Sequence, residues 1–422
     1  MRRLRRVLAA VVLLAAGGVA VSVPESGVGA AIPGGLLPFG CANLATRLSD
    51  ALLPAAPAPV REGVTCFGAV RLGVGSLGPT LTRGPIGYGP GDLQAAYGVA
   101  GRRAHGRTVA IIDAFDNPKA EADLAVYRAA YGLPPCTSDN GCFRKLNQNG
   151  KLAPLPSPDF GWAEEISLDL DAVSAVCPTC HILLVEANGP TIRPLTTAVD
   201  TAVRLGAVAV SNSYGGREDR SVLRWDWHFN RPGVTMTVAS GDTGYGVQWP
   251  ASSRFVTAVG GTTLEPATNR RGWTETAWPD AGSGCSRLER KPAWQHDRGC
   301  THRTVADVSA VADPRAGLGV YDTFNNCSLA LLCDTLIAAG TAKGLNGWAQ
   351  IGGTSLSTPV VAAIYALAGN HRKARWLYEH RGALHDVRTG SNGKCRVRYL
   401  CTARVGYDGP TGLGTPSGTG AF

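Results

Sequence analysis

The amino-acid sequence predicts an α/β fold with one doubly wound, mostly parallel sheet and helices on both of its faces. Strand-like apolar runs alternate with helical patterns from about residue 91 onward, which is typical of successive strand–helix–strand units. Glycine-rich polar segments follow several of these runs, where the loops of such a sheet lie. With 422 residues, of which 44% are hydrophobic and 17% are charged, the chain can bury a large core.

Residues 1–30 have the pattern of a secretory signal peptide. Four arginines precede an uncharged apolar stretch from Val7 to Val23, and small residues follow near Ala30. The apolar stretch is shorter than the roughly 20 residues that a membrane-spanning helix needs, so a retained membrane anchor is the less favoured alternative. We therefore expect a secreted, extracellular protein with no membrane contact after the signal peptide is cleaved. We also expect a monomer.

The rest of the chain divides into a short segment and one folded domain. Residues 31–85 are rich in proline, glycine and alanine, and are interpreted as a short pro-segment or an N-terminal arm. Residues 86–422 then form the domain. Its predicted strands are residues 108–112, 182–185, 207–210, 234–238 and 255–259, and its predicted helices are residues 120–131, 162–176, 195–205 and 358–368.

The charge pattern disfavours a nucleic-acid partner. The net charge of +9 falls to +6 when the four arginines and one glutamate of the signal peptide are removed. No cluster of lysine and arginine is interleaved with aromatic residues, as a nucleic-acid surface would require. We therefore expect no nucleic-acid partner.

The twelve cysteines indicate an oxidising compartment and six local disulfide loops. The Cys177-x-x-Cys180-His181 segment also matches the pattern of covalent haem attachment. The one methionine besides the initiator, Met236, lies in a strand-like run, so haem is disfavoured. The predicted pairs are Cys41–Cys66, Cys136–Cys142, Cys177–Cys180, Cys285–Cys300, Cys327–Cys333 and Cys395–Cys401.

Three polar segments follow strand-like runs and are expected to be loops: residues 211–216, 239–244 and 352–359. The third contains Ser355 at the start of an apolar helix, with Pro359 in the first turn, where a missing N–H costs nothing. A serine at this position faces free backbone N–H groups and the positive end of the helix, which suits a nucleophile and an oxyanion. The alternative is that Ser355 only caps the helix.

Glu165 and Asp169 are the candidate base and its partner. They are four positions apart and therefore share one face of the predicted helix 162–176. Two carboxyls on one face share a proton, which raises one pKa and allows the pair to act as a base at acid pH. The alternative is a solvated acidic face. The segment from Gly353 to Pro359 resembles the serine motif of subtilases, whose base is a histidine in a His-Gly-Thr motif, but none of the eight histidines of this chain lies in such a motif.

These residues together resemble the sedolisins, the serine-carboxyl peptidases, which have a subtilisin-like fold. The resemblance runs from about residue 85 to the end, so that residues 86–422 would be a sedolisin-type peptidase domain. The segment from Gly353 to Pro359 also reproduces the Gly-Thr-Ser-x-Ser-x-Pro motif of subtilases. The motifs that carry the resemblance are Glu165-x-x-x-Asp169, Ser211-Asn-Ser-Tyr-Gly215, Ala239-Ser-Gly-Asp242-x-Gly244, Pro250-Ala-Ser-Ser253, Val259-Gly-Gly-Thr262, Asp307-Val-Ser309 with Asp313-Pro314, and Gly353-Thr-Ser355.

The resemblance implies a role for each catalytic position. Ser355 is the nucleophile, Glu165 is the general base that later acts as an acid, and Asp169 orients Glu165. Asp242 is the oxyanion-hole residue, which requires a protonated carboxyl that can donate a hydrogen bond. The implied activity is an acid-favouring endopeptidase that acts on proteins or peptides. The expected substrate-binding residues, which accept an extended peptide, are Ser211, Ser213, Tyr214 and Gly215.

The resemblance also implies one Ca²⁺ site near the C-terminus. Its ligands would be the carboxylates of Asp386 and Asp408 with backbone oxygens of Val387, Arg404 and Gly406. Ligation by oxygen alone suits calcium. The basic segment from Ser391 to Cys401 lies between the two halves of this set and is less expected in the family.

Two features depart from the family pattern, and two other functions stay open. Residues 31–85 are too few for the large folded pro-domain that sedolisins usually carry. Asp113 stands where a subtilisin would have its triad aspartate, and is interpreted as a relic or as a residue of the substrate cleft. The chain could instead be a secreted, non-catalytic relative that binds peptides, or a conventional subtilisin, which the missing histidine motif disfavours.

Overall fold

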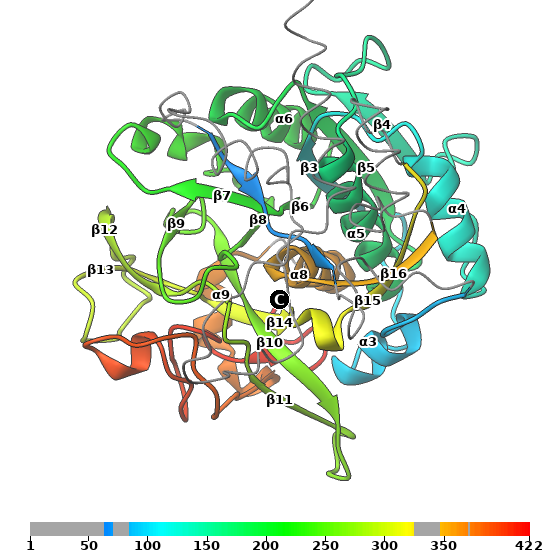
Figure 1. Ribbon diagram of the computed structural model, residues 1–422. Helices are drawn as coiled ribbons and strands as arrows, with labels where there is room; N and C mark the ends of the chain where they lie inside the picture. Colours follow the sequence, from blue (N-terminus) through cyan, green and yellow to red (C-terminus); the bar gives the residue numbers. More distant parts are fainter. Residues whose placement is uncertain (1–62, 71–83, 325–346, 370–371) are drawn as a thin grey trace, which may run out of the picture. The chain divides into compact units, whose positions relative to one another are not determined.

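The computed structural model describes residues 63–70, 84–324, 347–369 and 372–422 (Figure 1). The predicted signal peptide, residues 1–30, and most of the predicted arm lie outside these residues. Within the described chain, no helix is long and apolar enough to cross a membrane.

An eight-stranded sheet forms the centre of the domain, as predicted. Its strands follow the order β11-β10-β8-β6-β3-β5-β4, with β14 also paired to β10, and every pair is parallel except β10 with β11. The strands are β3 (Thr108–Ala114), β4 (Phe143–Asn147), β5 (His181–Ala187), β6 (Ala209–Asn212), β8 (Thr235–Ala239), β10 (Thr257–Pro266), β11 (Trp273–Ala277) and β14 (Val308–Val311).

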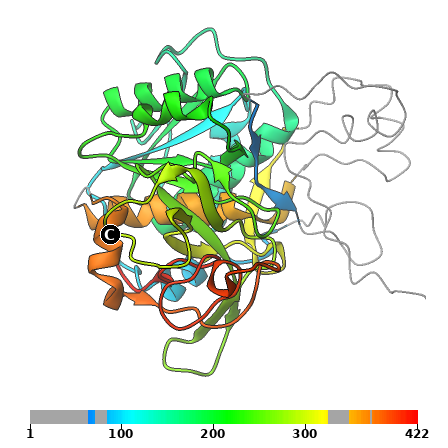
Figure 2. The same ribbon diagram turned by 90° about the vertical axis from the view of Figure 1, so that its left-hand side faces the viewer.

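Helices cover both faces of this sheet, which confirms the doubly wound arrangement (Figures 1 and 2). Successive side chains of a strand point to opposite faces, and β3 shows this division. Val109 and Ile111 pack with α5 (Phe160–Val176) and α8 (Thr354–Ala368) on one face. Ala110 and Ile112 pack with α6 (Ile192–Arg204) on the other. The shorter helices are α3 (Pro90–Ala96), α4 (Ala120–Ala130) and α9 (Ala374–Glu379).

Helix α5 is buried along almost its whole length, because α4, α8, β3 and β15 (Leu318–Asp322) all contact it. It begins after Asp159, whose side chain accepts a hydrogen bond from the Trp162 backbone N–H at 3.0 Å and so caps the helix. Every residue from Trp162 to Val176 is buried. The alternative of a solvated acidic face is therefore wrong, and the carboxyls of α5 lie inside the protein.

Helix α8 begins at Thr354, earlier than the predicted residue 358. Pro359 therefore lies inside the helix, and its expected place in the first turn is wrong. Proline has no N–H to donate to the carbonyl four residues earlier, which is that of Ser355. The Ser213 hydroxyl approaches this carbonyl oxygen instead, at 3.4 Å. The early start brings Ser355 into the first turn, so the prediction that it lies at the start of the helix is confirmed.

Shorter strands surround the central sheet. The segment 211–216, expected to be a loop, is divided between β6 and a separate strand, β7 (Tyr214–Arg217), so that expectation is wrong. Strand β7 pairs with β1 (Thr65–Cys66) and β9 (Gln248–Trp249), outside the central sheet. Strand β16 (Gly347–Gly352) pairs with β15 and with β2 (Ala69–Val70). Two further pairs of strands are β12 (Gly284–Arg290) with β13 (His302–Val305), and β17 (Leu384–His385) with β18 (Thr415–Pro416).

Four of the six predicted disulfides are confirmed: Cys136–Cys142, Cys177–Cys180, Cys285–Cys300 and Cys395–Cys401. The Cys177–Cys180 disulfide leaves neither thiol for haem, and His181 begins strand β5. Cys66 is disulfide-bonded, but the predicted partner Cys41 lies outside the described residues. The predicted pair Cys327–Cys333 also lies outside them.

Candidate active site

Ser355 lies where the carboxyl end of β16 leads into α8. Gly353 makes this turn with φ +106°, a conformation that favours glycine. The Ser355 side chain is fully buried. Its Oγ accepts a hydrogen bond from the Phe67 backbone N–H at 3.1 Å and donates one to the Ser213 carbonyl oxygen at 3.3 Å. The hydroxyl therefore faces Phe67, in the connection between β1 and β2, and Ser213, in the connection between β6 and β7.

Glu165 projects from α5 toward Ser355. Its Oε2 accepts a hydrogen bond from the Gly68 backbone N–H at 2.7 Å, and its Oε1 has no hydrogen-bond partner among the described residues. Burial raises the pKa of Glu165 well above its usual value, and the negative charge of Asp113 adds to this effect. The Ser355 hydroxyl acts in the opposite direction and lowers the pKa. Glu165 can therefore hold or release a proton beside Ser355 at a pH where an exposed glutamate would be ionised.

Asp169 lies one helical turn after Glu165 and is fully buried. Its two carboxylate oxygens accept hydrogen bonds from the Ser213 hydroxyl at 3.0 and 2.8 Å. Burial raises the pKa of Asp169 well above its usual value, and the charges of Asp113 and Glu165 raise it further. Ser213, expected to bind substrate, thus contacts both Asp169 and the Ser355 backbone.

Asp113 is a third buried carboxyl beside this pair. It lies near the carboxyl end of β3, is fully buried, and neither of its side-chain oxygens has a hydrogen-bond partner in the described chain. Burial raises the pKa of Asp113 to about 8. From the sequence, Asp113 is expected to be a relic or a residue of the substrate cleft. The structure instead places it close enough to raise the pKa of both Glu165 and Asp169.

Asp242 approaches Ser355 from the loop that follows β8. Its Oδ1 accepts hydrogen bonds from the Thr354 backbone N–H at 2.9 Å and the Thr354 hydroxyl at 2.7 Å. Its Oδ2 is shielded from solvent and has no partner among the described residues. A Cβ atom built on Gly353 would lie 2.6 Å from this Oδ2, so the oxygen borders the turn that carries Ser355. Burial raises the pKa of Asp242 to about 8, so a proton can reside on Oδ2 over a wide pH range.

The structure therefore brings Glu165, Asp169, Asp242 and Ser355 together from three elements far apart in the sequence. Within the described chain, no histidine hydrogen-bonds to Ser355, Glu165 or Asp169. The arrangement offers a hydroxyl, a carboxyl that can move a proton, and a second carboxyl that can donate a hydrogen bond.

A model described as the subtilase family matches residues 145–394 of the chain. The chain belongs to the subtilase family. Within the subtilases, the predicted resemblance to the sedolisins is confirmed. Kumamolisin from Bacillus sp. (strain MN-32) is 30% identical over 371 residues, which cover 79% of this chain and 63% of kumamolisin. Sedolisin from Pseudomonas sp. (strain 101) is 31% identical over 212 residues, which cover 43% of this chain and 33% of sedolisin. The chain thus spans less than two thirds of either relative.

A solved structure agrees with this assignment to the subtilases. It is Pseudomonas sedolisin, described as a serine-carboxyl proteinase in complex with two molecules of pseudo-iodotyrostatin. It superimposes with a TM-score of 0.65 at 25% sequence identity, covering 79% of this chain and 96% of that chain. The subtilisin-like α/β fold is therefore confirmed.

The four expected substrate-binding residues of this subtilase lie in different environments. Ser211 is fully buried in β6, and its hydroxyl has no hydrogen-bond partner in the described chain. Ser213 connects β6 to β7. Tyr214 and Gly215 lie in β7, opposite Cys66 and Thr65 of β1. Of the four, Tyr214 and Gly215 thus belong to a strand that pairs with an extended backbone segment.

Two of the five expected calcium ligands, Asp386 and Asp408, hydrogen-bond to one C-terminal loop, residues 404–408. Asp408 is fully buried, and its Oδ2 accepts a hydrogen bond from the Arg404 backbone N–H at 2.9 Å. Asp386 Oδ1 accepts one from the Gly406 backbone N–H at 3.0 Å. The structure thus brings both carboxylates to residues 404–408. Asp386 Oδ2 also accepts a hydrogen bond from the exposed Arg388 guanidinium at 2.9 Å, which would compete with a cation.

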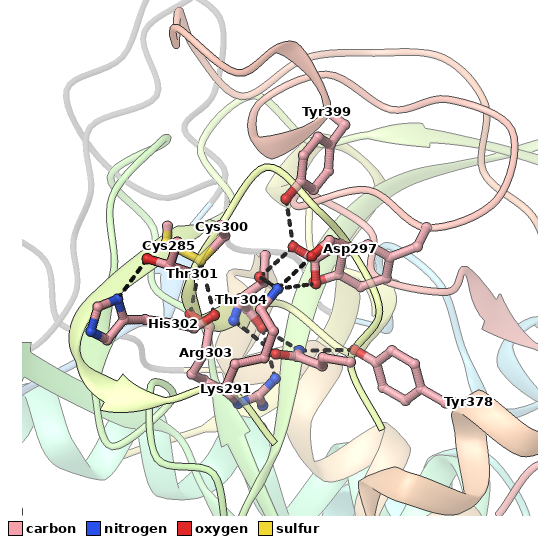
Figure 3. Close-up of polar contacts among 12 residues, drawn as sticks. Cys285, Lys291, Asp297, Cys300, Thr301, His302, Arg303, Thr304, Tyr378 and Tyr399 are labelled. Carbon is pink, nitrogen blue, oxygen red and sulfur yellow. Dashed lines mark hydrogen bonds and ion pairs between the residues drawn. A yellow bond between two sulfur atoms is a disulfide. The ribbon is translucent and has the colours of Figure 1, made fainter. Parts of the chain in front are cut away.

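A pocket of about 790 Å³ lies apart from the predicted catalytic residues and is lined by Trp294, Tyr378, Tyr399 and Arg404 among others. The Asp297 carboxylate at its wall accepts hydrogen bonds from Lys291 at 2.6 Å and Thr304 at 2.8 Å, and another from the Tyr399 hydroxyl (Figure 3). The positive charge of Lys291 therefore already balances the negative charge of this carboxylate. Of the predicted site residues, only Arg404 lines the pocket.

Proposed function

We propose that this subtilase is a secreted serine-carboxyl endopeptidase, in which Ser355 attacks the carbonyl carbon of the scissile peptide bond. The observation that carries the proposal is the convergence of Ser355, Glu165 and Asp242 on one backbone position, with no histidine beside them in the described chain. The N-terminal signal pattern and the four disulfides support secretion.

Glu165 is the proposed carrier of the proton. As Ser355 attacks, Glu165 takes the hydroxyl proton, and it then gives this proton to the nitrogen of the leaving amine. Water attacks the resulting acyl ester, and Glu165 again removes the proton. Glu165 Oε1 has no hydrogen-bond partner in the described chain, so it can take the proton from Ser355. Glu165 Oε2 faces a backbone N–H, so it can give the proton to a leaving nitrogen at that place. The Ser213 hydroxyl donates to the Asp169 carboxylate and fixes its position. Asp169 is the proposed partner of Glu165, and the two buried carboxyls share the proton between them.

Asp242 is the proposed donor to the oxyanion. Thr354 occupies Oδ1 with two hydrogen bonds, so the proton of a neutral Asp242 belongs on Oδ2. A fixed donor at this position stabilises the negative charge that develops on the carbonyl oxygen. Thr354 is a positioning residue that sequence reasoning missed, although its place directly before Ser355 is a signal that could have revealed it.

Peptide hydrolysis is expected to be faster at acid pH than at alkaline pH. Asp242 donates a hydrogen bond only while protonated, and its pKa lies at about 8, so kcat/KM should fall as the pH rises through about 8. The measurement is kcat/KM for a fluorogenic peptide from acid to alkaline pH. A rate that increased with pH through the usual histidine range would instead support a conventional subtilisin. No hydrolysis at any pH would support the non-catalytic peptide binder.

We also propose that residues 386–408 hold one Ca²⁺ ion. The donor set would fit this hard cation, because the two carboxylates, which meet at residues 404–408, and the backbone carbonyls of Val387, Arg404 and Gly406 all offer oxygen. Asp386 and Asp408 would bind through their carboxylates, and Val387, Arg404 and Gly406 through backbone oxygens. A bound Ca²⁺ would neutralise the two carboxylates and fix the loop on which they meet.

Calcium chelation is expected to destabilise the wild-type protein and not the Asp408→Asn variant. A ligand present at a hundred times its Kd contributes about 2.7 kcal/mol, which corresponds to a loss of roughly 5 °C in Tm when it is removed. The measurement is thermal unfolding with calcium and with a chelator. Asp139→Asn, at an exposed position, is the matched control and should respond like wild type. Equal Tm values for wild type in both solutions would contradict the site.

A further inference from the structure

Residues 63–70 lie in the candidate active site as an extended strand. On one side of Ser355, Thr65 and Cys66 pair antiparallel with Gly215 and Tyr214 of β7. On the other side, Ala69 and Val70 pair antiparallel with Gly352 and Ile351 of β16. The chain thus crosses from the edge of β7 to the edge of β16, which is how an extended peptide substrate binds between two strand edges.

The Phe67–Gly68 peptide bond lies at the point of crossing. The Phe67 N–H donates to Ser355 Oγ at 3.1 Å, and the Gly68 N–H donates to Glu165 Oε2 at 2.7 Å. A Cβ atom built on Gly353 would meet the Phe67 carbonyl oxygen at 1.8 Å and Asp242 Oδ2 at 2.6 Å. The carbonyl oxygen and the proposed oxyanion donor therefore lie against the same backbone position. The Gly68 nitrogen, which would be the leaving group, already faces Glu165, the proposed acid.

The Phe67 side chain occupies a closed site beside β7. It is only 5% exposed. A Cβ atom built on Gly215 would lie 2.8 Å and 3.0 Å from two carbons of the Phe67 ring, Cζ and Cε2. A larger residue at position 215 would therefore clash with the Phe67 ring. Because residue 215 is glycine, the ring can occupy this space.

We propose that Phe67–Gly68 is a bond that this protein cleaves in its own chain, and that Gly215 gives the site its preference for an aromatic residue before the cut. This inference rests on the proposed function. Ser355 Oγ adds to the Phe67 carbonyl carbon while its proton passes to Glu165. The C–N bond then breaks, and the Gly68 nitrogen takes that proton. Water hydrolyses the ester and leaves a carboxyl group on Phe67 and a new amino terminus at Gly68.

The first experiment follows the full-length chain after transfer to acid pH, by N-terminal sequencing and intact mass. Wild type should acquire the terminus Gly68, and Ser355→Ala should remain uncut while keeping the far-ultraviolet circular dichroism of wild type. Phe67→Tyr keeps the ring and should be cut at the wild-type rate. Phe67→Ala should be cut roughly 10- to 100-fold more slowly, because the burial of one phenylalanine side chain is lost.

The second experiment separates this inference from the proposed function. A synthetic peptide of residues 62–71 carrying Cys66→Ser is compared with the same peptide carrying Phe67→Ala as well. Wild type should prefer the phenylalanine peptide, and in Gly215→Val the ratio of kcat/KM for the two peptides should fall toward one. If wild type cuts other peptides but cuts its own chain elsewhere or not at all, the inference is wrong and the proposed function stands. If it cuts neither, the proposed function is wrong.

Discussion

Ser355→Ala should lower kcat/KM for peptide hydrolysis by roughly 10³-fold or more, because the variant has no oxygen to attack the carbonyl carbon. Ser355 is fully buried beside Glu165, and alanine fits the same space without the hydroxyl. The measurement is single-turnover and steady-state hydrolysis of a fluorogenic peptide at acid pH. Ser357→Ala is the matched control, since Ser357 lies in the same helix and its hydroxyl donates to the Thr354 carbonyl oxygen at 2.9 Å.

Glu165→Gln should lose about as much activity as Ser355→Ala, since glutamine keeps the shape of glutamate but cannot take the serine proton. If the two residues act in one step, the double variant should lose little more than either single variant. Additive losses would mean that Glu165 contributes to some other property, such as the packing of α5. Wild-type rates in Ser355→Ala would contradict the proposed nucleophile.

The variants Asp242→Ala and Asp242→Asn should differ sharply in their rates of peptide hydrolysis. Alanine removes the donor to the oxyanion, and the loss of one such donor costs roughly 10²- to 10³-fold in kcat. Asparagine can accept the two hydrogen bonds from Thr354 through its Oδ1 and place an N–H donor where Oδ2 lies in wild type. Because an amide does not titrate, Asp242→Asn should retain activity above pH 8, where wild type loses it.

The measurement is the pH dependence of kcat for the three proteins. Thermal unfolding of each protein serves as the control. Both variants alter the contact with Thr354, so a loss of stability must be separated from a loss of catalysis. If Asp242→Asn lost activity through the same pH range as wild type, the titrating group would not be Asp242.

Five of the eight strands of the central sheet, and the helices α4, α5, α6 and α8, could be predicted because local patterns specify them. Strand β3 and helix α5 were predicted within a few residues, since each contains a long apolar repeat. Strand β7 could not be predicted from its own residues. It owes its hydrogen bonds to β1 and β9, both far away in the sequence, and no local pattern indicates those partners.

The candidate catalytic residues could be named from motifs, but their surroundings could not. The spacing of Glu165 and Asp169 predicts a shared helix face, yet it does not indicate whether that face is buried. Burial depends on α4, α8 and β15, which cover α5 only after the chain has folded. The approach of Asp113 to Glu165 and Asp169 likewise depends on how β3 packs against α5. Its effect on their pKa values is a property of the three-dimensional structure alone.

On the proposed function, the strand edges of β7 and β16 would determine which proteins this subtilase can attack. A segment must offer its backbone N–H and carbonyl groups to both edges, so it must first leave its own helix or sheet. Acid pH favours this in many globular proteins, because their native carboxylates become protonated and their folds weaken. The same protons keep Asp242 neutral. Acidity would thus act twice, by preparing the enzyme and by unfolding its substrates.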